Sequence, residues 1–222
     1  MSDTPTISIV IPVRNEAGNL ASLAPLLAVP DVECILVDGG SGDGSAEIAR
    51  DLGFRVIDSP AGRARQMNAG AAAAGGDILL FLHADTSLPA GFVSLISDGL
   101  AGSGLVWGRF DVRLSGSHPM FRVIERMMNW RSALTGICTG DQAIFVWRDA
   151  FPGFPEIALM EDIELSAALR RRSRPLRIRA FVGTSSRRWQ KRGVMRTVLL
   201  MWSLRFAHRL GVSADTLAAW YR

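Results

Sequence analysis

Cysteine is scarce in this 222-residue sequence, which also lacks a long apolar run and a leader-like N-terminus. Its two cysteines, Cys34 and Cys138, lie far apart in apolar surroundings, which is typical of buried thiols in a reducing cytosol. No apolar stretch is both long enough and free enough of charge to predict a membrane span. Residues 1–6 lack the basic segment and cleavage site of a signal peptide. We therefore expect a cytoplasmic protein.

Acidic residues are missing from a long stretch of the second half. Between Leu165 and Ala214 there is no Asp or Glu, but there are 13 Arg and Lys residues. Residues 1–100 contain 5 basic and 12 acidic side chains, and residues 101–222 contain 20 and 9, so the net charges are −7 and +11. Such a basic region indicates a polyanionic partner: substrate phosphates, anionic lipid headgroups or nucleic acid. A docking element or base-reading motif for nucleic acid is absent, so we expect no nucleic acid partner.

The remaining composition is that of one folded domain, with 48% hydrophobic and 21% charged residues. In the first half, short apolar runs alternate with helical patterns. The expected strands there are 7–13, 34–37, 54–57 and 78–83, and the expected helices are 20–27, 45–52 and 63–74. This alternation predicts an α/β fold with a mostly parallel central sheet and helices on both faces. The second half is less regular; its expected strands are 106–114, 143–147 and 176–181, and its expected helices are 121–133, 163–171 and 194–210.

Polar residues follow the predicted strands of the first half. Residues 12–16 follow the first strand, Asp38 and a glycine-rich loop follow the second, Asp58 follows the third, and residues 83–85 follow the fourth. The carboxyl ends of parallel strands meet at one edge of a sheet, and ligands bind beyond that edge. The sequence therefore predicts a single binding site there.

The glycine-rich loop allows two interpretations. Gly40, Gly42 and Gly44 follow a strand and precede a helix, which resembles a dinucleotide-binding fingerprint and would suggest an NAD(P)-dependent oxidoreductase. The spacing is G-x-G-x-G rather than G-x-G-x-x-G, and Asp38 would repel a pyrophosphate, although it suits hydrogen bonding to a base or ribose. The alternative is a tight turn in which Asp43 or Ser45 caps the next helix.

Three acidic positions could carry chemistry. Asp85 follows a strongly apolar strand, where a carboxylate can hold Mg²⁺ or Mn²⁺ against a diphosphate; the alternative is a cap for a helix starting near Pro89. Glu161 and Asp162 open a helix, where they either complement the helix dipole or supply a general base.

The basic region offers two further candidates. Residues 185–192 contain guanidinium groups and an indole that could bind phosphate and cover a ring, or that simply form a solvated loop. The helix expected at 194–210 is amphipathic and rich in arginine. It predicts a peripheral contact with a membrane, or a helix packed on the core with its polar face in water.

Six motifs in order resemble the family 2 glycosyltransferases, which have the GT-A fold. The matching segments are ISIVIPVRNE at 7–16, ILVDGGSGDGS at 35–45, GRARQMNAGAAAAGGDILLFLHADT at 62–86, GDQAIFV at 140–146, MEDIEL at 160–165 and RRW at 187–189. The resemblance is greatest to small single-domain bacterial members. It implies a glycosyltransferase domain over residues 1–190, followed by a basic amphipathic helical appendage over residues 191–222.

The resemblance also implies roles for individual residues. Those expected to contact the nucleotide sugar are Pro12, Arg14, Glu16, Asp38, Arg63, Arg188 and Trp189. Asp85 is expected to bind a divalent metal, Mg or Mn, with His83 as a second and weaker candidate ligand. Glu161 and Asp162 are the catalytic pair, with Asp162 as the base of an inverting transfer to an acceptor that is lipid-linked or a small molecule.

Two departures from the family pattern affect these expectations. His83 stands where the family has a first aspartate, which puts the metal preference in question. Ser185 replaces the glutamine of the Gln-x-x-Arg-Trp signature, and the sequence has no set of membrane spans, so a processive polysaccharide synthase is not expected. A degenerate transferase without catalysis is the remaining alternative within the family, and the presence of Asp85 and Asp162 argues against it.

Overall fold

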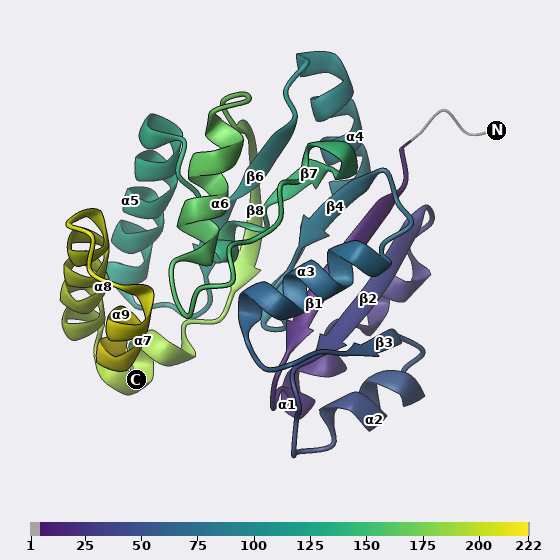
Figure 1. The fold of residues 1–222 in the computed structure, drawn as a ribbon, viewed down its shortest axis with the longest axis horizontal. Coiled ribbons are helices and arrows are strands. Elements are labelled where there is room, and N and C mark those ends of the chain that lie inside the picture. The colour runs from purple at the N-terminus through teal and green to yellow at the C-terminus, as the bar shows by residue number, and fades with distance from the viewer. Residues whose placement is uncertain (1–4, 222) are drawn as a thin grey trace.

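A computed structural model describes residues 5–221, apart from the side chains of Arg188, Lys191 and Arg192. It contains one twisted sheet with the strand order β3-β2-β1-β4-β7-β6-β8-β5 (Figure 1). The strands are β1 (Ile7–Val13), β2 (Val32–Asp38), β3 (Arg55–Asp58), β4 (Ile78–Phe81), β5 (Thr86–Ser87), β6 (Trp107–Leu114), β7 (Phe145–Trp147) and β8 (Leu176–Thr184). The α-helices are α1 (Ala17–Leu20), α2 (Ser45–Asp51), α3 (Arg63–Ala73), α4 (Phe92–Ser103), α5 (Pro119–Thr135), α6 (Glu161–Arg170), α7 (Arg187–Arg192), α8 (Val194–Arg209) and α9 (Ala214–Tyr221). Short 3₁₀ helices cover Ala24–Ala28, Gly140–Gln142 and Arg148–Ala150.

The sheet is mostly parallel, as the sequence predicts. Strands β1 to β4 are parallel where they pair, and so are β6 and β8, whereas β7 runs antiparallel to both of its neighbours. Alternate residues of β1 point to opposite faces, with Ile9 in one apolar cluster and Val10 in the other. Helix α4 covers the first face and α3 the second, so the predicted α/β fold with helices on both faces is confirmed.

The structure departs from the expected elements mainly at their ends. The helix expected at 20–27 is divided into α1 and the 3₁₀ helix Ala24–Ala28, where a proline occupies one of the first two positions. Proline lacks a backbone N–H and therefore cannot continue the hydrogen bonding of the preceding turn. Helices α7 and α9 and the two-residue strand β5 had no counterpart among the expected elements.

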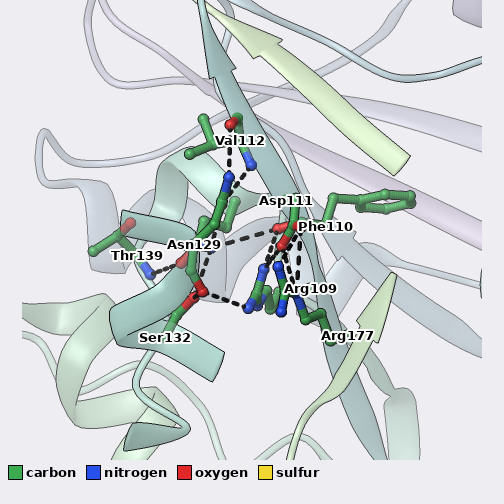
Figure 2. Close-up of polar contacts among 9 residues, drawn as sticks. Arg109, Phe110, Asp111, Val112, Asn129, Ser132, Thr139 and Arg177 are labelled. Carbon is green, nitrogen blue, oxygen red and sulfur yellow. Dashed lines mark hydrogen bonds and ion pairs between the residues drawn. The ribbon is translucent and has the colours of Figure 1, made fainter. Parts of the chain in front are cut away.

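A buried polar network joins α5 to β6 (Figure 2). Arg109 is fully buried and forms an ion pair with Asp111, which also binds Arg177 with a Nη2–Oδ2 distance of 2.7 Å. Asn129 of α5 binds the backbone of Val112 in both directions, accepting from its N–H at 2.8 Å and donating to its carbonyl at 3.0 Å. Buried polar groups are stable only when they are paired, so these contacts fix α5 against the strand.

The same network reaches the segment that precedes β7. The Gln142 amide donates to the hydroxyl of Ser132 at 3.0 Å, and its oxygen accepts the N–H of Thr139 at 3.3 Å. Gln142 is fully buried. The backbone of residues 139–142 is therefore held in one conformation, which positions Gly140 and Asp141 at the sheet edge.

The C-terminal helices pack on the start of α6. Leu204 of α8 and Leu217 of α9 are fully buried against Met160, which directly precedes α6. The expected domain boundary at residue 190 falls within α7. Among residues 5–221, no helix combines the length and apolar character needed to cross a bilayer.

Candidate active site

Helix α3 is anchored where β1 and β2 end. The Gln66 side-chain amide donates to the carbonyls of Val13 and Val37, at 2.8 and 2.9 Å. The helix lies so close to the sheet that a β-carbon on Gly70 would come within 2.3 Å of the Val10 side chain. This packing places Arg63, one turn before Gln66, at the carboxyl edge of the sheet.

Asp38 is buried at that edge, in register with Val13 of β1 and Asp58 of β3. Its Oδ2 accepts the backbone N–H groups of Gly40 and Ser41, at 2.9 and 3.0 Å. Its Oδ1 is also buried but has no hydrogen-bond partner among the described residues. A buried acceptor without a partner is costly, so this oxygen is available for a ligand donor.

The glycine-rich loop does not form a dinucleotide cradle. The N–H groups of Gly40 and Ser41 are used by Asp38, and that of Gly42 donates to Asn15 Oδ1 at 2.8 Å. A pyrophosphate site needs free N–H donors at this position, so the NAD(P) interpretation is wrong. Gly44 rather than a side chain occupies the N-cap of α2, and Asp43 accepts the N–H of Ser45 within the turn.

The loop after β1 lies beside the glycine-rich loop. Pro12 and Glu16 are half-buried and Arg14 is exposed. The N–H of Glu16 donates to Ser45 Oγ at 2.9 Å, and the Glu16 carboxylate accepts from the side chain of Asn19. The three expected nucleotide contacts in residues 12–16 thus share the edge with Asp38.

His83 follows β4 and faces a segment from the second half of the chain. Its Nδ1 lies 3.5 Å from Asp141 Oδ1, and a β-carbon on Gly140 would lie only 2.5 Å from its Nε2. The close approach explains why glycine occupies position 140. Among the described residues, no group of three His, Cys, Asp or Glu side chains is arranged to hold a metal ion, and the expected role of His83 as a metal ligand stays a prediction.

Asp162 is tied to the same loop. Its Oδ2 accepts the N–H of Gly140 at 2.8 Å, and its Oδ1 accepts the N–H of Ile163 at 2.8 Å. The neighbouring Glu161 is buried, and its Oε1 lies 3.4 Å from Nη1 of Arg63. Residues that are far apart in the sequence, from α3, β4 and α6, therefore meet at one place.

Burial raises the pKa of the Glu161 carboxyl, and the adjacent negative charge of Asp162 raises it further. The positive charges of Arg63 and His83 act in the opposite direction. Two carboxyls in contact cannot both ionise without cost. The two neighbouring carboxyls therefore differ in their surroundings: Glu161 is buried, and its raised pKa favours the neutral form.

Asp85 lines a cleft with a volume of about 380 Å³. Arg113 and Arg187 line the same cleft, which supplies two guanidinium groups beside one carboxylate. Asp38 and Asp162 are not among the described residues that line it. The alternative role of Asp85 as a helix cap is wrong, because the N-cap of α4 is Gly91.

Two arginines near Asp162 were not predicted from the sequence. Arg131 of α5 and Arg205 of α8 each have a buried guanidinium nitrogen, Nη2 and Nε, without a hydrogen-bond partner among the described residues. Burial, together with the nearby charge of Arg205, lowers the pKa of Arg131 to about 10, although the charge of Asp162 acts in the opposite direction. Burial also lowers the pKa of Arg205, against the charges of Asp162 and Asp141. Within α5 and α8, no sequence signal separates these two arginines from the exposed ones.

The remaining two residues expected to contact the nucleotide sugar, Arg188 and Trp189, belong to α7. Trp189 is half-buried and packs against a small apolar cluster that contains Leu114 and Phe121. Its indole therefore has a packing role in addition to any contact with a ligand. The side chain of Arg188 lies outside the described part of the structure, so its expected phosphate contact stays a prediction.

Comparison with protein families gives a match over about two thirds of the chain. The model described as Glycosyl transferase family 2 matches residues 8–153. Over 95 residues the chain is 37% identical to the 4,4'-diaponeurosporenoate glycosyltransferase of Staphylococcus haemolyticus, a match that covers 38% of this chain and 25% of that protein. The matches to curated relatives span from 25% to 37% of their lengths.

Solved structures show the same fold at low sequence identity. Residues 1–349 of TarS from S. aureus, in complex with UDP-GlcNAc, superpose with a TM-score of 0.64 and 15% identity over 82% of this chain and 59% of that one. The mannosyltransferase PcManGT from Pyrobaculum calidifontis, in complex with GDP-Man and Mn²⁺, gives a TM-score of 0.64 and 20% identity over 94% and 63%. These similarities confirm the GT-A fold.

Proposed function

Because the chain belongs to glycosyl transferase family 2, we propose that it transfers a sugar from a nucleotide-diphosphate donor to an acceptor hydroxyl, with inversion at the anomeric carbon. The observation that carries this proposal is the meeting of His83, Gly140 and Asp162 beyond the ends of the parallel strands. A carboxylate held there by two backbone N–H groups has a fixed orientation towards a bound substrate.

The donor is assigned to the edge formed by β1, β2 and α3. Asp38 Oδ1 is a buried acceptor with no described partner, which suits a base N–H or a ribose hydroxyl. The half-buried Pro12 and Glu16 flank it, and Arg14 and Arg63 are the cations available to the phosphates. Relatives of this fold have been captured with UDP-GlcNAc and with GDP-Man, which supports a nucleotide sugar as the donor.

We further propose that a divalent metal binds at Asp85 together with the diphosphate of the donor, as the Mn²⁺ in the complex of PcManGT with GDP-Man suggests. Mg²⁺ and Mn²⁺ commonly bind through one or two carboxylates and complete their shell with substrate phosphates and water. Asp85 supplies one hard oxygen ligand in a cleft that also contains Arg113 and Arg187, so a bound diphosphate would be needed to complete the site. When bound, such a metal stabilises negative charge on the leaving diphosphate.

Asp162 is proposed as the base. Its carboxylate takes the proton from the acceptor hydroxyl as that oxygen attacks the anomeric carbon and the bond to the diphosphate breaks. The guanidinium groups of Arg131 and Arg205 place positive charge near this carboxylate. Burial and the charge of Asp162 raise the pKa of Glu161, which accepts a hydrogen bond from Arg63, so we assign it a supporting role beside Asp162 rather than the role of the base.

The alternative function, binding to a membrane surface, is supported by a separate observation. A membrane-binding module was expected from the basic second half, and α5 and α8 do expose large apolar side chains. Membrane binding does not compete with catalysis, because the exposed apolar side chains belong to α5 and α8, whereas the proposed base belongs to α6. The two properties are therefore compatible in one protein.

Donor binding can be tested by titration calorimetry with UDP, GDP and their sugars, with and without Mn²⁺. Asp38→Asn is expected to weaken binding of the preferred donor about tenfold to a hundredfold, the effect of losing a hydrogen bond to a charged group. Asp85→Asn is expected to abolish the dependence on Mn²⁺. The matched control is Asp58→Asn, a side chain that ends β3 at the same edge but is 81% exposed.

The proposal predicts that Asp58→Asn leaves the affinity unchanged. It would be contradicted if no nucleoside diphosphate or its sugar bound the wild-type protein. Equal losses in Asp38→Asn and Asp58→Asn would contradict the assignment of Asp38.

A further inference from the structure

Two neighbouring helices each expose a stripe of large apolar side chains. On α5 the stripe consists of Val123, Met127, Trp130 and Leu134. On α8 it consists of Met195, Leu199, Trp202 and Phe206, and it continues to Leu210, which directly follows the helix. Within each stripe the residues are three or four positions apart, which places them on one side of a helix. Each stripe is therefore a continuous apolar surface, and together they are called the α5–α8 face.

The two helices lie side by side (Figure 1). Phe121 and Ile124 of α5 pack in one apolar cluster with Val194 and Val198 of α8. The side of α8 that faces the protein is apolar as well, with Leu204 fully buried. Helix α8 thus packs on the core, as one interpretation of the sequence expected, but its exposed side carries large apolar side chains together with Arg196 and Arg209 instead of being polar throughout.

The most exposed large apolar side chains among the described residues lie on this face. Trp130 is 67% exposed, Phe206 66% and Leu210 69%, whereas those on other elements reach 54% at Trp220 of α9, 44% at Phe181 of β8 and 39% at Leu95 of α4. Single exposed apolar residues are normal on protein surfaces, but a contiguous patch marks a binding surface. The α5–α8 face is therefore expected to be covered in the functional state.

The exposed charges on these helices are all positive. Arg126 of α5 and Arg196 and Arg209 of α8 are exposed, whereas Glu125, the acidic residue on α5, is buried and binds Arg122. Helix α8 contains no acidic residue. One acidic side chain from outside these helices, Glu164 of α6, pairs with His208 of α8 at 2.8 Å. An apolar surface whose own helices expose only basic charge is complementary to a layer that is apolar inside and negative at its boundary.

We propose that the α5–α8 face binds the surface of a membrane that contains anionic lipids. Trp130 and Trp202 have the amphipathic indoles that favour the headgroup region, and Phe206 and Leu210 can enter the acyl boundary. Arginine side chains bind lipid phosphates while their stems cover apolar surface. A second copy of the chain is a poorer occupant, because an isologous contact would bring the same arginines together.

Membrane binding also has a consequence for the site. Arg131 and Arg205 come from the same two helices as the exposed stripes and carry positive charge towards Asp162. A bound membrane would therefore lie next to the base and present acceptors that are dissolved in lipid. This consequence rests on the proposed transferase function, whereas membrane binding itself does not.

The test is flotation of the full chain with vesicles of phosphatidylcholine alone and of phosphatidylcholine mixed with phosphatidylglycerol. The wild-type protein is expected to float with the anionic vesicles and to remain behind with the neutral ones. The double variant Trp202→Ser with Phe206→Ser is expected to reduce binding at least tenfold. Arg196→Gln with Arg209→Gln is expected to reduce it roughly twentyfold, since each arginine near an anionic surface contributes about fivefold.

The matched control replaces apolar side chains that are exposed on other helices, Ile48→Ser with Leu95→Ser, and should bind as the wild type does. The proposal is overturned if the wild-type chain does not float with anionic vesicles, or if the control loses as much binding as the α8 variant. A concentration-dependent dimer that the α8 variant abolishes, without vesicle binding, would assign the face to a second copy. Flotation needs no substrate, so a missing transferase activity would not affect these outcomes.

Discussion

The two halves of the sheet are stabilised by different means. In the first half, β1 to β4 are packed between apolar layers, and the single buried charged side chain among the described residues is Asp38. In the second half, the structure buries Arg109, Asp111, Glu125 and Glu161. Apolar alternation is enough to build the first half, whereas the second half depends on specific pairs of charged and polar groups.

The two halves also divide the proposed function. The first half has a net charge of −7 over residues 1–100 and supplies the donor edge with Asp38 and Asp85. The second half has a net charge of +11 over residues 101–222 and supplies the proposed base, the half-buried Arg131 and Arg205, and the exposed apolar face. Donor recognition and turnover should therefore respond to substitutions in different halves.

The largest expected effect separates these two properties. Asp162→Asn removes the proposed base but keeps the size of the side chain and an oxygen that can accept a backbone N–H. Turnover should fall by roughly two to four orders of magnitude, the usual contribution of a general base, while donor affinity stays unchanged. Steady-state kinetics and calorimetric titration of the donor measure the two quantities. Near-normal turnover in this variant would remove Asp162 from the base role.

The next expected effect concerns the stability of the second half. Asp111→Asn removes the anion that pairs with the fully buried Arg109, and breaking a buried pair in this way costs about 3–5 kcal/mol of unfolding free energy. Asp58→Asn is the control from the first half, since its pair with Arg50 at 3.7 Å is exposed and should contribute less than about 1 kcal/mol. Urea denaturation compares the two. Similar losses of unfolding free energy in the two variants would contradict the conclusion that buried charged pairs stabilise the second half more than the first.

A smaller effect should depend on pH. The pKa of Glu161 is raised in the folded state by burial and by Asp162, so its contribution to stability is present below its unfolded pKa and is lost as the pH rises through the folded value. Glu161→Gln should therefore gain unfolding free energy relative to the wild type as the pH increases from acidic to neutral. Glu47→Gln, an exposed first-turn residue of α2, should show no such gain. A pH-independent difference for Glu161→Gln would contradict the raised pKa.

The sequence predicted the first half better than the second for a physical reason. The strands β1, β2 and β4 are short runs whose burial follows from their apolar residues alone, and Asp38 and Asp85 could be located because they follow such strands. The contact of His83 with residues 140 and 141 depends on how β7 enters the sheet between β4 and β6, which local pattern does not encode.

The role of α8 could not be read from its residue types either. Its apolar residues occupy both the inner and the outer side of the helix, and the structure alone shows which side is covered. Arg131 and Arg205 were missed for the same reason, because their proximity to Asp162 is produced by the packing of α5 and α8. Within each helix they are spaced no differently from the exposed arginines.

The most direct measurement is the release of nucleoside diphosphate from a panel of UDP- and GDP-sugars by the purified wild-type chain with Mn²⁺, with water as the acceptor. Proton NMR of the freed sugar, recorded before mutarotation, gives its anomeric configuration. The proposed mechanism predicts that at least one donor is cleaved and that its sugar appears first as the inverted anomer. Retention of configuration, or no cleavage of any donor in the panel, would contradict it.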